Sequence, residues 1–492
     1  MFAPSQQIHP MKTIHSLLLS AIAFLAFASI ASAQSLYYDP ALASGSNWFG
    51  ANNWGTALGG PYDTNWTDGN TAIWNNTAIK QYSIGSSTVN VAGMTNLGSN
   101  AVWIIATGGT VAFSGGTMSG EFDFRGTSNL SGTPTLSSGQ LDWNGTGGFN
   151  GTLTIDGGSV RPTQAMVSPA SHFVVNDGTL AYQQTATYTS GGHVTVDGGE
   201  FSVGAFSAAR SVEINSLQGT GGTILPRLGN VASISTLTVN QTTNTAYSGN
   251  VAGVQTFSAT TYLTLTKSGI GSLTLNGSTL NLREGTTVNG GTLLINGGGT
   301  RNFERLSGSN AITVANGGTF GGTSTLAIFG GDNVVVQDGG SLAAGNGVGV
   351  AGRTTLSFQS GGSLDLTSVT TETGWLAFDL GGNTTAGTTY DQIRVTNGGL
   401  NIGTGLLNFN DFSFTTLAGF DVGTYTLFDL TGSASISGTL GGSLVGTVSP
   451  GYQGTLYQSG NNILMDVIPE PSTALLAISG FTAAFFLRRR RN

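Results

Sequence analysis

The residues best suited to chemistry lie in one short run, Glu121-Phe122-Asp123-Phe124-Arg125. On a β-strand Glu121, Asp123 and Arg125 would share one face, while the two Phe would point to the other. Two carboxylates beside a guanidinium could perform the acid–base chemistry that cleaves polysaccharides. The same residues could form a solvated ion pair above an aromatic interior. We expect the ion pair and keep the three residues as catalytic candidates.

Other kinds of site find little support in the sequence. With no Cys, the chain can form neither disulfides nor thiolate metal sites. It contains no P-loop, no dinucleotide-binding fingerprint and no HExxH. Asp before Gly-Gly is irregular and often replaced by Asn, so turn chemistry explains it better than a calcium-binding repeat, although a chance calcium site stays open. We therefore expect no metal and no other cofactor.

Composition and charge narrow the class of protein. Only 8% of the 492 residues are charged, and 78 are Gly, whereas ordinary domains have about 25% charged residues and about 7% Gly. Five of the 16 basic residues lie in the end segments, at Lys12 and Arg488 to Arg491, with one acid, Glu470. The rest of the chain carries 11 basic and 23 acidic residues, a net charge of −12. Such a body has no basic stripe for nucleic acid.

One phrase recurs along the body: Asn or Asp, then Gly-Gly, then a small polar residue and an apolar one. Asp156-Gly157-Gly158-Ser159-Val160 and Asn289-Gly290-Gly291-Thr292-Leu293 are examples. The second Gly falls at 158, 178, 199, 222, 291, 318, 340 and 362. If the long interval from 222 to 291 holds three coils, the period is about 22 residues, which indicates a solenoid.

The segments between these turns alternate apolar and polar residues, as in Leu263-Thr264-Leu265 and Leu273-Thr274-Leu275. Period two is typical of half-buried strands. We therefore predict an all-β fold, a right-handed parallel β-helix, with repeats over residues 100–375 and about 16 or 17 coils between 100 and 466. A set of β-sandwiches is the alternative, but sandwiches show strand spacings of about 8 to 12 residues without a long period.

Each end of the body differs from the repeats. Residues 34–99 contain four Trp within a short span, which we expect to fill an N-terminal cap; stacking of sugars on exposed indoles is the alternative. The four are Trp48, Trp54, Trp66 and Trp74. Residues 376–466 should form the terminal coils and a C-terminal cap.

The two chain ends are typical of export signals. Residues 1–33 form a signal peptide, with Met11 as the better start and Ala31-Ser32-Ala33 as the signal-peptidase site. At residues 467–492, Pro469-Glu470-Pro471 precedes an apolar run from 474 to 487 and then Arg488, Arg489, Arg490 and Arg491. This predicts one transmembrane helix with a cytoplasmic Arg tail, so the body lies outside the inner membrane.

The tail resembles the PEP-CTERM sorting signal, in its tripeptide, apolar helix and Arg cluster. The resemblance implies cleavage by an exosortase-like membrane protease in a Gram-negative bacterium that makes exopolysaccharide. A permanent tail anchor is the alternative.

Lys267 to Gly277 and Gly285 to Gly297 resemble the autotransporter-associated β-strand repeat. This repeat implies β-helical coils in secreted surface proteins. Because the sorting tail stands where a translocator barrel would be, we do not expect self-transport.

These observations favour an exported, structural or adhesive protein of the cell surface or extracellular matrix rather than an enzyme. Its expected partners are signal peptidase, the exosortase-like protease and exopolysaccharide, with an inner-membrane-anchored precursor. The alternative is a polysaccharide lyase or glycoside hydrolase on the same scaffold.

Overall fold

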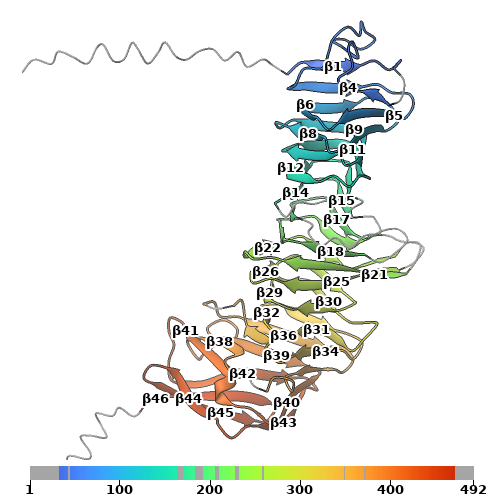
Figure 1. Ribbon diagram of the computed structural model, residues 1–492. Coiled ribbons are helices and arrows are strands. Elements are labelled where there is room, and N and C mark those ends of the chain that lie inside the picture. Colours follow the sequence, from blue (N-terminus) through green and yellow to red (C-terminus); the bar gives the residue numbers. More distant parts are fainter. Residues whose placement is uncertain are drawn as a thin grey trace, which may run out of the picture.

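The computed structural model describes residues 33–470 except 43–44, 163–169, 183–191, 205–209, 228–231, 257–259, 348 and 371–372. Within these ranges the chain forms β-strands and a single 3₁₀ turn, η1 (Phe409–Asp411), without an α-helix. The strands stack coil upon coil into an elongated body (Figure 1). The prediction of an all-β protein with parallel, stacked strands is confirmed.

Fifteen strands form a continuous parallel stack on one side of the coils, which we call ladder 1. Each pairs with the equivalent strand one coil further along the chain. Its members are β5 (Lys80–Gly85), β7 (Val102–Ala106), β9 (Thr117–Gly126), β11 (Thr135–Trp143), β13 (Ser159–Pro162), β15 (Thr179–Tyr182), β17 (Glu200–Val203), β20 (Thr223–Pro226), β23 (Asn250–Ala252), β27 (Thr279–Leu282), β30 (Thr300–Phe303), β33 (Thr325–Ile328), β36 (Arg353–Phe358), β39 (Gln392–Thr396) and β42 (Gly423–Thr431).

A second parallel stack, ladder 2, continues from the first half of the body into the second through a bridge between Gly219 and Tyr247. Its members are β1 (Ser35–Tyr38), β4 (Asn70–Trp74), β6 (Thr88–Asn96), β8 (Thr110–Phe113), β10 (Asn129–Gly132), β12 (Phe149–Ile155), β14 (His172–Val175), β16 (His193–Val196), β19 (Ser216–Gln218), β22 (Thr245–Tyr247), β26 (Ser272–Leu275), β29 (Gly291–Ile295), β32 (Gly318–Gly322), β35 (Ser341–Ala344), β38 (Leu376–Leu380) and β41 (Phe412–Thr416).

The third stack, ladder 3, belongs to the second half of the body. Its members are β18 (Ser211–Ile214), β21 (Ser233–Asn240), β25 (Thr260–Ser268), β28 (Thr286–Val288), β31 (Asn310–Val314), β34 (Asn333–Val336), β37 (Ser363–Asp365), β40 (Gly399–Leu407) and β43 (Ser435–Leu440). In these coils the chain passes from ladder 3 to ladder 2 and then to ladder 1, so three sheets enclose one interior.

Antiparallel pairing of whole strands is confined, within the described ranges, to the two ends and one side hairpin, while isolated antiparallel bridges join Glu284 to Arg305, Gly322 to Gly345 and Leu380 to Tyr390. At the first end β3 (Trp54–Gly55) pairs with β1, while β2 (Ser46–Asn47) pairs in parallel with β5. At the last end β44 (Val445–Ser449), β45 (Tyr452–Ser459) and β46 (Asn462–Pro469) fold back onto β42. The side hairpin joins β24 (Val254–Thr256) to β25. The first strand of ladder 2 and the last strand of ladder 1 are therefore each paired with an antiparallel strand.

The coils are less uniform than the Gly-Gly period suggests. In the first half Leu153 pairs with Phe173, and Phe173 with Val194, which gives coils of 20 and 21 residues. Later coils are longer, since Leu356 pairs with Val395, 39 residues on. Ladder 1 accordingly has 14 described strands beyond residue 100, so the expected 16 or 17 coils are too many.

The interval from residue 222 to 291 does not hold three coils, which corrects our reading of the repeat. Gly222 precedes β20 of ladder 1, but Gly291 opens β29 of ladder 2. The chain completes two coils between them, from Thr223 to Asn250 and on to Thr279, and then part of a third. The Gly-Gly turn has moved to another corner of the coil, which the spacing alone did not reveal.

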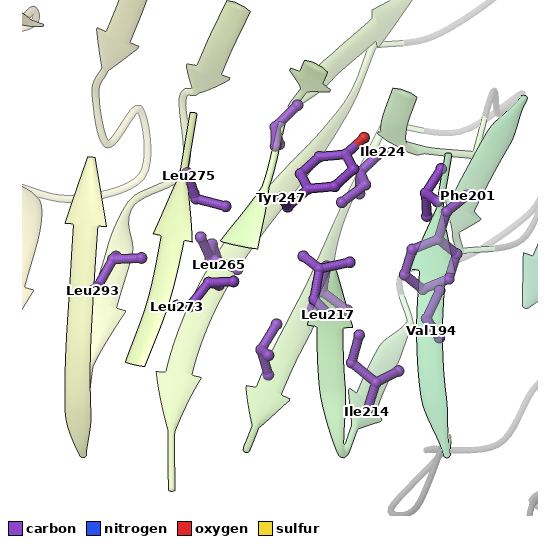
Figure 2. Close-up of a cluster of buried hydrophobic side chains, with 14 of the residues drawn as sticks. Val194, Phe201, Ile214, Leu217, Ile224, Tyr247, Leu265, Leu273, Leu275 and Leu293 are labelled. Carbon is purple, nitrogen blue, oxygen red and sulfur yellow. The ribbon is translucent and has the colours of Figure 1, made fainter. Parts of the chain in front are cut away.

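The core is a set of columns in which apolar side chains of successive coils touch. On ladder 2, Leu273, Leu293 and Phe320 follow one another in register, and all three are buried. Figure 2 shows how such side chains from neighbouring strands point into the same interior. Burying this apolar surface stabilises the stack, because each coil covers the core of the one before it.

Corners depend on glycine where the chain turns with positive φ directly above the previous coil. Gly158 has φ +72°, and a Cβ built there would lie 2.1 Å from the carbonyl oxygen of Gly139. No side chain fits at that distance, so the Asp-Gly-Gly phrase combines turn geometry with close backbone approach.

The predicted end segments lie mostly outside the described residues. Ala31 of the signal-peptidase site, the apolar run and Pro471 to Arg491 lie outside them, whereas Ala33 is described and exposed. Within the described part of the chain, no helix is long and apolar enough to cross a membrane. The parallel coils already begin inside the expected N-terminal cap, since β5 pairs with β7. In the expected C-terminal segment, ladder 1 continues through β39 and β42, and the antiparallel hairpin follows.

Candidate functional site

The charged residues of the body gather on ladder 1. All four ion pairs found among the described residues lie there, and three of them join one coil to the next. Nine of the 11 basic residues of the body lie on ladder-1 strands or within two residues of one: Lys80, Arg125, Arg161, Arg227, Arg283, Arg301, Arg305, Arg353 and Arg394. Ladder 1 is therefore the face on which basic side chains and ion pairs are concentrated.

The three catalytic candidates lie on β9 as the strand alternation predicted, with Phe122 and Phe124 buried in the interior. Asp123 accepts a hydrogen bond from Arg125, with 2.8 Å between Nε and Oδ2. The Arg125 guanidinium lies 3.4 Å above the centre of the Trp103 ring, a cation–π contact. Asp123 and Arg125 thus form the expected ion pair, and Glu121 is exposed beside it.

Asp142 occupies the same outward column as Asp123, one coil further on. Its carboxylate accepts hydrogen bonds from Arg161 of the next coil and from Gln140. Burial raises the pKa of Asp142, and Arg161 partly offsets this effect. The remaining oxygen of Asp123 accepts from Asn144 at 2.9 Å.

Each oxygen of these two carboxylates therefore has a partner, and two of the donors, Asn144 and Arg161, come from the next coil. Such an arrangement ties coils together laterally. A general acid or nucleophile needs a carboxylate that can reach substrate. The network around Asp123 and Asp142 is better suited to holding the face than to catalysis.

The four Trp of the first segment pack on one another. Trp48, Trp54 and Trp74 are fully buried, and the ring of Trp48 lies 5.2 Å from each of the other three, centre to centre. Trp66 is partly buried, and its Nε1 donates to Asp68 at 3.0 Å. The three buried indoles have no exposed face on which a sugar could stack, and the cluster fills the first open coil.

A polar groove follows ladder 2 near the first strands of ladder 3. It has a volume of about 470 Å³ and is lined by hydroxyl, amide and carboxylate side chains, among them Thr195, Asp197 and Gln218. His172 Nε2 lies 2.7 Å from the Thr195 hydroxyl, to which Gln218 also donates at 3.1 Å. Burial, together with the nearby His193, lowers the pKa of His172. This groove was not foreseen, because its residues come from three separate coils.

A second hollow lies on the outward face of ladder 1. It has a volume of about 250 Å³ and is lined by Asn281, Arg283, Asn302 and Phe329. These residues also come from three successive coils, and the varying coil length hid their proximity in the sequence.

Two cations occupy the interior itself. Lys267 is fully buried, and its ammonium donates to the carbonyls of Ser268, Gly269 and Gly290 at 2.6 to 3.2 Å. Burial lowers the pKa of Lys267 to about 8. Arg301 similarly donates to the Asn296 carbonyl at 3.0 Å. Both satisfy corner carbonyls that would otherwise be buried without donors.

The described ranges contain no group of three His, Asp or Glu side chains that could hold a metal ion.

Of the sorting-signal residues, Pro469 ends β46 and pairs with Tyr452, and the Glu470 backbone N–H donates to the carbonyl of Gly451. In comparisons with known proteins, no family model and no curated protein matches the chain.

Proposed function

We propose that this chain is an exported β-helical rod of the cell surface or extracellular matrix that binds exopolysaccharide, with a structural or adhesive role. The observation that carries the proposal is the outward chemistry of the ladders. On ladder 3, Thr238, Thr266, Thr287 and Thr313 follow one another in register and are partly exposed. Their hydroxyl groups can both donate and accept hydrogen bonds, as sugar hydroxyls do.

A similar column runs along ladder 2, through Ser272, Thr292, Thr319 and Ser341. Successive coils repeat at about 4.8 Å, so a long polymer lying along the rod meets the same groups many times. Individually weak contacts then add through avidity. The charged side chains on ladder 1 bond to one another and tie coils together, which supports a binding rather than a catalytic role.

The remaining parts of the proposal concern export and coil direction. A signal peptide would lead the precursor through the inner membrane, and an exosortase-like protease would cut near Pro469-Glu470-Pro471 before release. The coils are proposed to be right-handed, since parallel β-crossovers have this hand in about 98% of cases.

Cell fractionation with mass spectrometry of the mature C-terminus tests the sorting step. We expect the released form to lack the Arg cluster, and a deletion of residues 469–471 to leave the protein uncut in the membrane. Unchanged release of the deletion variant would refute sorting. Incubating the purified chain with neutral and uronic-acid polysaccharides tests binding against turnover: retention without shortened products supports the adhesive role, and shortened products lost in Asp123→Ala would instead establish the enzyme.

A further inference from the structure

The hollow on ladder 1 between β27 and the residue after β33 differs from the flat faces around it. Asn281 and Asn302 stand in one outward column, and the positions before and after them in that column are Ala252 and Ala327. Small residues on both sides leave the two amides at the floor of a depression. Phe329 forms a wall, one coil above Glu304.

The floor contains a polar atom that the protein does not satisfy. The side-chain oxygen of Asn281 is buried and has no hydrogen-bond partner among the described residues. Buried polar atoms nearly always have a partner, and this oxygen would gain a donor if the Asn281 side chain turned toward the hollow. A water or a ligand hydroxyl meets this need.

Phe329 adds an apolar surface to these polar groups. Its side chain is only partly buried although it is large and apolar. The hollow combines one aromatic face with two amides and a guanidinium, so it is more polar than a typical small-molecule pocket, which is mainly apolar. Sugar rings match this combination, because they present an apolar face of C–H groups and an edge of hydroxyls.

Charge decides between neutral and acidic sugars. Arg283 is held by Glu304, with 2.6 Å between Nε and Oε2, so the pair contributes no net charge. Glu284 and Asp332 lie close to the same pair, and Arg305 offsets only one of them. The surroundings are therefore net negative and disfavour a uronate.

The volume of the hollow limits how many sugar rings it can hold. Sites for drug-sized ligands span about 300–1,000 Å³, and this hollow has about 250 Å³. It suits a single ring rather than several.

From these observations we propose that the hollow formed by Asn281, Arg283, Asn302 and Phe329 is a subsite for one neutral pyranose unit of a polysaccharide. The sugar ring stacks on Phe329, and its hydroxyls bond to the two Asn amides and to the free N–H groups of Arg283. The subsite rests on the proposed polysaccharide-binding function and fixes the register of the polymer on the rod.

The test is equilibrium binding of the full chain to immobilised dextran and galactomannan, as neutral polymers, and to alginate, as a uronate polymer. We expect tighter binding to a neutral polymer. Phe329→Ala should weaken it by about tenfold or more, equivalent to about 1.4 kcal/mol, and Phe329→Tyr should restore it. Asn302→Ala should weaken it as well.

Gln359→Ala is the matched control, because Gln359 is exposed one coil beyond Phe329 and outside the hollow. Its binding should equal that of the native chain, and the unfolding midpoint of each variant confirms that the fold is intact. Neutral-polymer binding that Phe329→Ala leaves unchanged overturns the subsite while the proposed function stands. Preference for alginate overturns the neutral class, and no binding to any polymer overturns the proposed function as well.

Discussion

Asp391 offers the sharpest test of the energetics, because it is a carboxylate enclosed by backbone. It is 1% exposed and lies just before β39. Its oxygens accept from the N–H groups of Gly352, at 2.7 Å, and Asp379, at 2.9 Å. Burial nevertheless raises the pKa of Asp391 to about 8, and the nearby Asp379 carboxylate adds to the effect.

Because the folded pKa lies above the ordinary value of 3.8, the folded chain keeps a proton that the unfolded chain releases. This contribution to stability is fully present below about pH 4 and is lost as the pH rises to about 8. One proton corresponds to about 1.4 kcal/mol per pH unit, so the free energy of unfolding should fall by about 3 kcal/mol between pH 5 and pH 7 from this group.

The assay is urea unfolding of the native chain and of Asp391→Asn at pH 5, 6 and 7. Asn keeps an acceptor for Gly352 but turns an amide N–H₂ toward the Asp379 N–H, which costs about 1–3 kcal/mol at every pH. The difference in unfolding free energy between variant and native should therefore shift by about 3 kcal/mol in favour of the variant from pH 5 to pH 7. Asp156→Asn, at an exposed corner, controls for net charge. A difference that stays constant with pH would refute the reasoning.

Three further predictions concern packing, corners and the interior cation. Leu293→Ala should lower the free energy of unfolding by about 2–5 kcal/mol, whereas Thr292→Ala on the outward side of the same strand should change it by less than about 0.5 kcal/mol, both measured in urea. Gly199→Ala should destabilise the chain by more than about 1 kcal/mol, since its φ is +59° and a Cβ would lie 2.4 Å from a carbonyl oxygen of the previous coil; Gly298→Ala, where a Cβ meets open space, should be close to neutral, and equal effects would contradict the corner argument. The lowered pKa of Lys267 means that the free energy of unfolding should rise from about pH 8 to pH 10, and Lys267→Met should abolish this rise in the same titration.

The alternation of apolar and polar residues along the strands predicted most of the fold. The run Leu263-Thr264-Leu265 places Leu inside and Thr outside, as the period of two predicts. The same parity puts Lys267 inside, a position that its charge argues against. The corner carbonyls explain this exception, because they supply acceptors that no local pattern reveals.

Contacts between coils could not be predicted from the sequence, since they depend on the number of residues in each coil. Asp142 and its partner Arg161 are 19 residues apart, whereas Arg394 and Asp429 are 35 apart. The extra residues lie in corners of varying length, so a single period cannot align both pairs. The hollow at Phe329 stayed hidden for the same reason.

The antiparallel strands at the two ends of the stack have a consequence for size. An open parallel coil would present unpaired backbone to another molecule and could grow into a fibre. At the last coil β46 pairs with β42 and blocks such growth along ladder 1. The number of coils sets a fixed reach, about 70 Å from the first to the last strand of ladder 1 at about 4.8 Å a step. The molecule can act as a spacer of defined length, and adding or deleting one coil would lengthen or shorten it in steps.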